Sequence, residues 1–237
     1  MTERAAIVTG GSRGIGLAIA RALLAEGASV SITGKNRDHL ARASSSIEAG
    51  DSGRLQAIPA DVRRYSEVER AFSTTVGRFG GIDILVNNAG VGHFTNVADM
   101  TQDAWSEVMD TNLTGVFNAC HAGLPHLRRR GGGSIINISS LAGKNPFAGG
   151  AAYCASKAGL NAFSEALMQE VRYDGIRVSY VLPGSVATEF MGGDSAQGAD
   201  WKVGPEDVAE IVLDLICHNP RSLPSRVELR PTKPPRK

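Results

Sequence analysis

Short apolar runs alternate along the chain with longer stretches in which apolar residues recur every three to four positions. The apolar runs predict strands at 5–9, 29–33, 54–60, 82–86, 134–139, 176–182 and 226–230. The longer stretches predict helices at about 14–26, up to 49, up to 79, at 103–130, 151–172 and 208–216. Nearly continuous apolar strands are typical of a parallel sheet that is covered on both faces. The pattern therefore predicts an α/β, doubly wound (Rossmann) fold, with a parallel sheet of about seven strands flanked by helices.

Nothing in the pattern divides the chain into two units. Its 237 residues are normal for one large α/β domain, and we expect a single domain over residues 1–230. The end of the chain, 231–237, is rich in proline and basic residues. We expect it to form a flexible tail.

Composition narrows the possible functions. The chain has 25 Lys and Arg against 24 Asp and Glu, a formal charge of +1, which offers no footprint for nucleic acid or an anionic membrane. It has neither a signal-peptide pattern nor an apolar stretch of about 18 residues, so we expect a cytoplasmic protein that does not engage a membrane. Its three cysteines and five histidines lack the spacing of metal ligands, so no metal site is expected.

The first predicted strand runs directly into the segment TGGSRGIG, Thr9–Gly16, where a helix is predicted to begin. Glycines in such a turn let a ligand approach the backbone, and the start of the helix offers free N–H groups to a diphosphate. A plain strand-to-helix turn is the alternative. The segment predicts a dinucleotide site with contacts from Gly10, Ser12, Arg13, Gly14, Ile15 and Gly16.

The end of the second predicted strand indicates which dinucleotide is preferred. An NAD site would place an acidic residue there for the ribose hydroxyls, but the sequence continues Gly34-Lys35-Asn36-Arg37. The extra phosphate of NADP favours cations such as Lys35 and Arg13. The alternative is that these are solvated surface charges. We therefore expect NADP(H) to be preferred over NAD.

Tyr153 and Lys157 lie four residues apart in YCASK, so one helical turn can place both on the same side. A phenol has a pKa near 10 and is a reluctant acid at neutral pH. A nearby ammonium would lower that pKa and make the proton available. A pair of unrelated surface side chains is the alternative.

Three motifs in this order, TGGSRGIG, NNAG at 87–90 and YCASK at 153–157, resemble the classical short-chain dehydrogenase/reductase family of the NADP-preferring type. The resemblance covers the chain from Ile7 to about Thr188. It implies hydride transfer between NADP(H) and a carbonyl compound or secondary alcohol, with a proton relay formed by Asn112, Ser140, Tyr153 and Lys157. It implies further cofactor contacts from Asp61, Val62, Asn88, Ala89, Gly90, Tyr153, Lys157, Pro183, Gly184, Val186 and Thr188.

Several roles stay open at this point. Asp61 could reach the adenine or cap a helix, Asn112 could be bonded locally within its helix, and Ser139 is an alternative to Ser140. The family covers its substrate with the region corresponding to about 189–204, so we expect a short lid there. The side chains that could line the substrate pocket are His93, Phe94, Phe147, Phe190 and Met191.

The resemblance also implies a homodimer or homotetramer formed through the two long helices at 103–130 and 151–172. The end of the chain departs from the 3-oxoacyl-carrier-protein reductases, which often close with an Asp-Gly-Gly segment. That specific activity remains an alternative to a general carbonyl reductase. A non-catalytic NADP(H)-binding regulator and an epimerase or dehydratase on the same scaffold are further alternatives.

Overall fold

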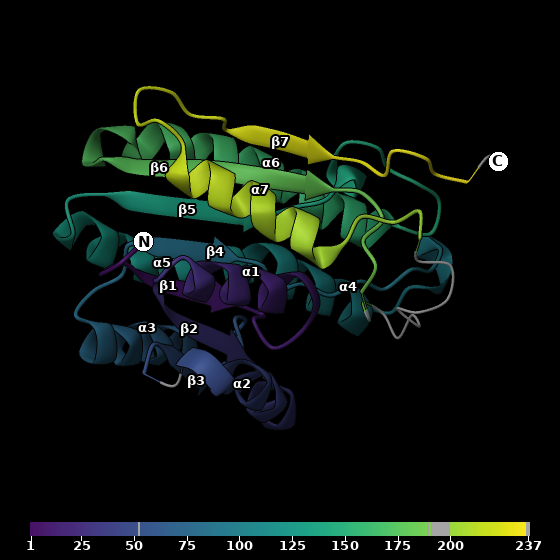
Figure 1. The fold of residues 1–237 in the computed structure, drawn as a ribbon. Helices are drawn as coiled ribbons and strands as arrows, with labels where there is room; N and C mark the ends of the chain where they lie inside the picture. Colours follow the sequence, from purple (N-terminus) through teal and green to yellow (C-terminus); the bar gives the residue numbers. More distant parts are fainter. Residues whose placement is uncertain (52, 189, 191–199, 236–237) are drawn as a thin grey trace.

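The computed structural model describes residues 1–51, 53–188, 190 and 200–235. Within these ranges, seven strands form one parallel sheet in the order β3-β2-β1-β4-β5-β6-β7 (Figure 1). The strands are β1 (Ala5–Thr9), β2 (Ser29–Gly34), β3 (Leu55–Pro59), β4 (Ile84–Asn87), β5 (Gly133–Ile138), β6 (Ile176–Pro183) and β7 (Arg226–Leu229). The helices are α1 (Gly14–Ala25), α2 (Arg37–Asp51), α3 (Tyr65–Phe79), α4 (Gln102–Met109), α5 (Gly115–Arg129), α6 (Ala151–Val171) and α7 (Pro205–Cys217).

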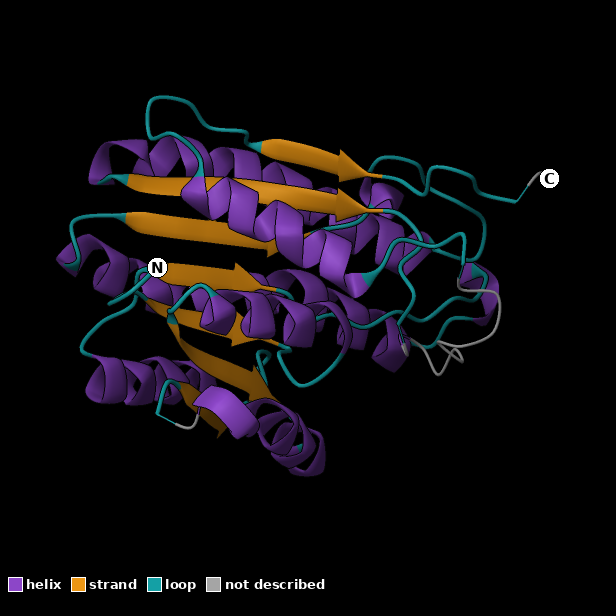
Figure 2. Cartoon of the chain, viewed as in Figure 1, coloured by secondary structure: helices purple, strands orange, loops and turns teal. Residues whose placement is uncertain are grey.

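Helices cover both faces of the sheet, so the predicted doubly wound fold is confirmed (Figure 2). Helices α1 and α7 pack on one face, while α3, α5 and α6 pack on the other. Side chains alternate between the two faces along each strand. In β1, Ala6 and Val8 belong to the core under α1 and α7, and Ile7 belongs to the opposite core. Both faces are therefore apolar, which explains the continuous apolar runs in the sequence.

The long helix predicted at 103–130 is interrupted. Helix α4 ends at Met109, a π-helical turn follows at Asp110–Thr114, and α5 begins at Gly115. A π turn closes i→i+5 hydrogen bonds and stays within a continuous helical stretch, so the sequence pattern predicts one helix here. Such turns are frequent at functional sites, and this one contains Asn112.

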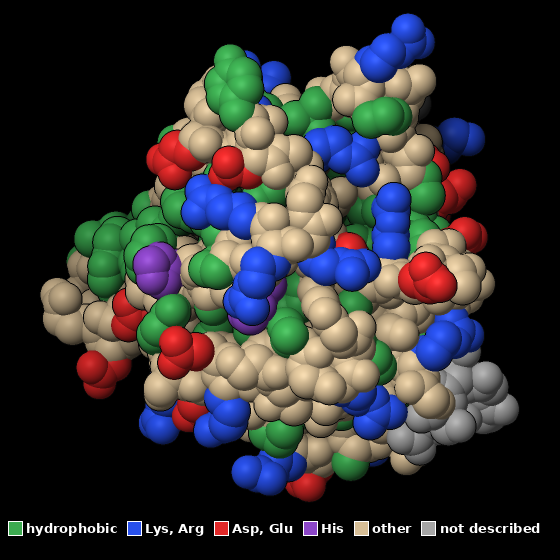
Figure 3. All heavy atoms as spheres, turned by 90° about the vertical axis from the view of Figure 1, so that its left-hand side faces the viewer, with side chains coloured by type: hydrophobic (Ala, Val, Ile, Leu, Met, Phe, Trp, Pro, Cys, Tyr) green, Lys and Arg blue, Asp and Glu red, His purple; other side chains and the backbone are tan. Residues whose placement is uncertain are grey.

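All strands point the same way, so their carboxyl ends meet at one edge of the sheet, at the right in Figure 1. In open α/β sheets, ligands bind outside these carboxyl ends, where the strand order reverses. Here the reversal lies between β1 and β4. Figure 3 faces the opposite edge, where basic side chains lie among acidic ones. No helix within the described ranges is long and apolar enough to cross a bilayer.

Candidate active site

A cavity of about 950 Å³ lies at the carboxyl edge of the sheet. One end is lined by residues that follow β2 and β3, and the other by residues that follow β6 and β7. Two of the predicted site residues, Gly16 and Asn112, are buried and do not line it. The predicted residues that do are Gly10, Ser12, Arg13, Gly14, Ile15, Lys35, Asp61, Val62, Asn88, Ala89, Gly90, Ser140, Tyr153, Lys157, Pro183, Gly184, Val186 and Thr188.

The turn after β1 has the geometry of an anion site. Gly10 and Gly14 have φ values of 63° and 53°, which strongly favour glycine. A Cβ on Gly16 would lie 2.4 Å from the carbonyl oxygen of Gly10, so only glycine fits there. Helix α1 begins without a side-chain cap from Arg13, which leaves its first N–H groups for a ligand. These features fit the diphosphate of a dinucleotide.

Hydrogen bonds between the end of β1 and the residues just after β4 hold this turn in place. The Asn88 amide donates to the carbonyl oxygens of Thr9 and Gly10, both at 3.0 Å. The Thr9 hydroxyl in turn accepts from the backbone N–H groups of Asn88 and Ala89, at 3.0 and 3.1 Å. Asn88 therefore positions the glycine turn. Its neighbour Asn87 is buried and donates to Asn137 Oδ1 on β5 at 2.8 Å, which is a structural contact.

Charged side chains gather at the end of the cavity that follows β2 and β3. The Lys35 ammonium lies 3.3 Å from Glu107 on α4, and Glu107 also binds His93 at 2.9 Å. Arg63 binds Asp61 at 2.6 Å and approaches the same Glu107 at 3.9 Å. Sequence reasoning missed Arg63 and Glu107. The position of Arg63 just after the third strand was the available signal.

Two expectations are corrected here. Helix α3 begins after Arg64 without a side-chain cap, so Asp61 does not cap it. The Asp61 carboxylate instead accepts from the backbone and guanidinium of Arg63, which lowers the Asp61 pKa. His93 was a candidate for the substrate pocket, but its ring pairs with Glu107 and does not line the cavity.

Tyr153 and Lys157 both lie near the start of α6 and face the cavity. The Lys157 ammonium is 5.9 Å from the centroid of the Tyr153 ring and donates to the Ile138 carbonyl oxygen at 2.9 Å. Lys157 is only 4% exposed, and burial lowers its pKa to about 8. The ammonium thus reaches the carboxyl end of β5, where it forms a buried amine beside the phenol.

The phenol itself departs from expectation. Burial raises the pKa of Tyr153, and a hydrogen bond with Ser140 opposes this shift only in part. The expected lowering relies on the ammonium together with the positive nicotinamide ring, and it is not seen in the chain without nucleotide because burial is the largest influence on this pKa.

Ser139 and Ser140 take different positions. The Ser139 hydroxyl is buried and binds Asn161 Oδ1 on α6 at 2.5 Å. The Ser140 hydroxyl accepts from the backbone N–H of Ala142 at 3.1 Å and also bonds to Tyr153 in the cavity. A hydroxyl accepting one bond still has its own proton to donate. The geometry favours Ser140 as the residue that meets a substrate.

Asn112 is fully buried in the π turn. Its side chain accepts from the Val91 N–H and donates to the Val91 carbonyl oxygen, both at 2.9 Å. It also donates to the Ser156 hydroxyl on α6 at 3.0 Å. The local bonding considered from the sequence is therefore wrong. Asn112 links the segment after β4 to the helix that carries Tyr153 and Lys157.

Aromatic rings surround the phenol. The Tyr153 ring lies 5.5 Å from Phe94 and 6.0 Å from Phe190, measured between ring centroids. Phe147 packs on Phe94 at 5.5 Å. All three phenylalanines line the cavity, whereas Met191 and most of the expected lid at 189–204 lie outside the described residues.

The carboxyl end of β6 completes the wall of the cavity. Thr188 lies against the glycine turn, since a Cβ on Gly14 would be 3.2 Å from its methyl group. Arg230 also lines the cavity, as do Pro231 and Pro234 from the tail. That these residues line the cavity does not test the expected flexibility of 231–237, which stays a prediction.

The family model of the short chain dehydrogenases matches residues 4–198. The chain therefore belongs to the short-chain dehydrogenase/reductase family of oxidoreductases, as its motifs predicted. A curated relative, the 3-oxoacyl-[acyl-carrier-protein] reductase FabG of Chlamydia muridarum, is 34% identical over 225 residues, which cover 91% of this chain and 90% of that protein.

Solved structures agree with this assignment. A metagenomic short-chain oxidoreductase in complex with NADP is 35% identical, with a TM-score of 0.85 over 98% of this chain and 99% of that one. An alcohol dehydrogenase from the archaeon Thermococcus sibiricus, complexed with 5-hydroxy-NADP, is 28% identical, with a TM-score of 0.88 over 99% of both chains.

Proposed function

We propose that the protein is an NADP(H)-dependent oxidoreductase that interconverts a carbonyl compound and a secondary alcohol. The convergence of Ser140, Tyr153 and Lys157 in one cavity with the glycine turn of α1 carries this proposal. When bound, the nicotinamide supplies or accepts the hydride. The chain's own residues bind and orient both partners and move the proton.

The geometry suggests a role for each side chain. The Tyr153 hydroxyl donates its proton to the carbonyl oxygen as that oxygen gains charge. The Ser140 hydroxyl donates a hydrogen bond to the same oxygen. Lys157 holds the sugar of the cofactor and supports the phenol electrostatically, and Asn112 fixes α6 against the segment after β4. The raised pKa of Tyr153 keeps the phenol protonated, as a proton donor must be.

Preference for NADP(H) is supported by charge. Arg13, Lys35 and Arg63 line one end of the cavity, and β2 ends in Gly34 with no acidic residue directly after it. An extra phosphate would satisfy these cations, whereas ribose hydroxyls would not. Two similar structures contain NADP or a derivative of it, which agrees with this choice.

Turnover tests the reaction. The protein is mixed with NADPH and a panel of ketones and aldehydes, and the absorbance of the reduced nicotinamide is followed. Tyr153→Phe should lower kcat/KM by about 100-fold or more. Tyr173→Phe is the matched control, because Tyr173 is 93% exposed and does not line the cavity. Tight binding of NADPH without turnover of any compound would instead indicate a regulator. A product formed without net oxidation of the NADPH would indicate an epimerase.

The cofactor preference has a separate test. Lys35→Ala should raise the Kd of NADPH by about tenfold and leave that of NADH unchanged. Arg37→Ala is the control, since Arg37 follows the same strand but does not line the cavity. Equal rates with both cofactors in all variants would contradict the proposal.

A second candidate function is favoured by the FabG relatives, which are named as 3-oxoacyl-[acyl-carrier-protein] reductases. The same panel distinguishes it by including a 3-oxoacyl thioester. A kcat/KM for the thioester far above that for all simple ketones would select the specific reductase.

We also propose that the chain self-associates through α5 and α6. Phe117 on α5 is 49% exposed and stacks on His121, with ring centroids 5.6 Å apart. Light scattering on the wild type and on Phe117→Ser tests this. A monomeric wild type would contradict it.

A further inference from the structure

Arg230 lies next to the proposed reaction centre although it is near the end of the chain. It directly follows β7, and the Gly184 N–H at the end of β6 donates to the Leu229 carbonyl oxygen at 2.8 Å. A Cβ on Gly184 would lie 3.3 Å from Leu141, the neighbour of Ser140. The backbone therefore fixes Arg230 beside Gly184 at the end of β6, and Gly184 in turn lies against Leu141, the neighbour of Ser140.

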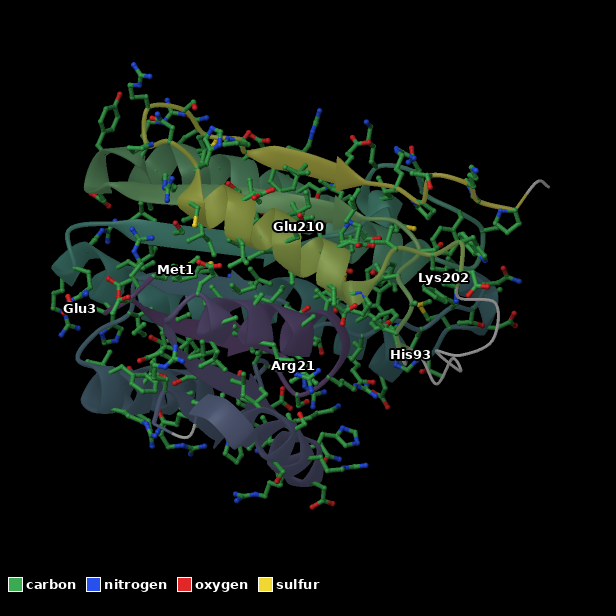
Figure 4. The ribbon with its side chains drawn as sticks, viewed as in Figure 1. Met1, Glu3, Arg21, His93, Lys202 and Glu210 are labelled. Carbon is green, nitrogen blue, oxygen red and sulfur yellow. The ribbon has the colours of Figure 1, made fainter. Side chains whose placement is uncertain are left out.

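Lys202 is held close to the segment that follows β6, 184–187, through its neighbour Val203. Its neighbour Val203 pairs with Val186 in a parallel bridge. The Val203 N–H donates to the Ser185 carbonyl oxygen at 3.0 Å, and its own carbonyl oxygen accepts from Ala187 at 2.9 Å. Lys202 and Arg230 both line the cavity, and Figure 4 shows Lys202 beyond the carboxyl ends of the strands.

Within the part of the chain that the structure describes, a single carboxylate pairs with these two cations. Among the described residues, Lys202 forms no ion pair or hydrogen bond. Arg230 contacts Glu228 through one nitrogen at 2.9 Å, but Glu228 also binds Lys144 at 2.6 Å. One carboxylate thus faces two cations, and most Arg230 donors remain available. Asp200 and Asp207 line an adjoining groove that Lys202 and Arg230 also border, but neither carboxylate lines this cavity or forms an ion pair with either cation within the described ranges.

The position of Arg230 separates it from the proposed phosphate cations. Lys35 follows β2, whereas Arg230 follows β7, and the strand order places these five positions apart. At about 4.8 Å per strand, the two sites are roughly 24 Å apart across the sheet. A single 2′-phosphate cannot serve both. The cations beside β6 and β7 are therefore available to another anion.

The part of the cavity around the phenol is apolar. Phe94, Phe147 and Phe190 surround the Tyr153 ring and are 46%, 48% and 39% exposed. Exposed aromatic clusters in a cavity are typical of sites for apolar ligand groups. The same cavity therefore contains two cations and an aromatic cluster, and the phenol lies within that cluster.

We propose that the substrate is an oxo acid: a carbonyl compound with a carboxylate held by Lys202 and Arg230 and an apolar group held by the phenylalanines. This inference rests on the proposed function and names the substrate class of that site. The carbonyl carbon accepts a hydride from NADPH, and its oxygen takes the proton of Tyr153. The products are the hydroxy acid and NADP+, and the carboxylate is unchanged. In the reverse direction the hydroxy acid is oxidised.

The test compares acids with their neutral esters. Benzoylformate, 3-benzoylpropionate and 4-benzoylbutyrate are each assayed with NADPH beside the corresponding methyl ester. For the acid whose length fits, the acid-to-ester ratio of kcat/KM should fall by about tenfold in Lys202→Met and in Arg230→Met. Because the same acid and ester are used for every variant, the difference in their intrinsic reactivity cancels when the ratios of variant and wild type are compared. Lys233→Met is the matched control, because Lys233 lines only the adjoining groove.

Several outcomes would overturn the proposal. The proposal is wrong if Lys202→Met and Arg230→Met leave the acid-to-ester ratio of kcat/KM unchanged for all three acids. It is also wrong if Lys233→Met lowers that ratio as much as they do. A tenfold rise in the Kd of NADPH with unchanged ratios would assign the cations to the cofactor. Phosphonate analogues that outperform every acid would assign them to a phosphate-bearing substrate.

Failure of the proposed function gives a different result. If neither acids nor esters are reduced, binding of phenylacetate and phenylacetamide to the NADPH complex is measured by nicotinamide fluorescence. Tighter binding of phenylacetate that depends on Lys202 would support the anion site without the reaction. Equal binding of both compounds would overturn it. Turnover of esters alone, abolished in Tyr153→Phe, would support the reductase and overturn the oxo-acid preference.

Discussion

Replacing Lys157 with methionine should stabilise the protein while it removes activity. The lysine is 4% exposed, and burial lowers its pKa from 10.5 to about 8. At about 1.4 kcal/mol per pKa unit, this shift represents about 3 kcal/mol against the charged form. Methionine has a similar stem and no charge, so it avoids this cost.

The gain is smaller than 3 kcal/mol because the amine also makes a hydrogen bond. The Lys157 ammonium donates to the Ile138 carbonyl oxygen at 2.9 Å, and losing that donor costs about 1–3 kcal/mol. We expect Lys157→Met to be more stable than the wild type by about 1 kcal/mol at pH 7 without nucleotide. For a domain of this size, the melting temperature should rise by about 2–4 °C.

The pH dependence identifies the cause. Below about pH 8 the lysine is charged in both states, so the cost of burial is complete. Between about pH 8 and 10.5 the unfolded chain binds more protons than the folded protein, so the stability of the wild type rises relative to the variant. The advantage of Lys157→Met should therefore shrink across this range.

Urea unfolding at pH 7 and pH 9.5 measures both effects. Lys35→Met is the control, since Lys35 is 60% exposed and should change stability by less than about 0.5 kcal/mol. A variant that is less stable than the wild type at pH 7 would refute the reasoning. An advantage that does not change with pH would show that the buried charge is not its source.

Two further predictions concern the cofactor and the substrate oxygen. Glu107→Gln should lower the Kd of NADPH by about threefold without affecting the Kd of NADH, because Glu107 competes with a 2′-phosphate for Lys35. Fluorescence titrations measure both Kd values, and Asp103→Asn on the same helix is the control. An increased Kd of NADPH in Glu107→Gln would contradict this prediction. Ser140→Ala should lower kcat by about 100-fold, whereas Ser139→Ala should keep kcat and lose about 1 kcal/mol of stability with its bond to α6. Steady-state rates and urea unfolding measure these effects, and the reverse pattern would exchange the two roles.

Much of the fold could be predicted because the two faces of the sheet are both buried. That burial makes each strand an apolar run, and the predicted 5–9 coincides with β1 (Ala5–Thr9). The parallel topology then brings residues that end different strands to one edge. Ser140 after β5 and Gly184 after β6 could be placed in one site for this reason, before any side chain was positioned.

Other features depend on contacts that no local pattern encodes. The π turn containing Asn112 lies within a stretch whose pattern predicts one continuous helix, and its i→i+5 hydrogen bonds are not encoded in that pattern. The pairing of Lys35 with Glu107 joins residues 72 positions apart. Arg230 reaches the site only because β7 pairs with β6, which the sequence of either strand does not specify.

The same burial acts on both members of the Tyr153–Lys157 pair, in opposite directions. It raises the pKa of the phenol and lowers that of the amine, so both shifts are toward the neutral form, although Lys157 stays charged below about pH 8. A neutral phenol retains the proton that carbonyl reduction requires. Alcohol oxidation requires the phenolate, which the chain alone disfavours. The protein therefore supplies the proton donor by burial, and the charge needed for the reverse reaction must come from the ligands that fill the cavity.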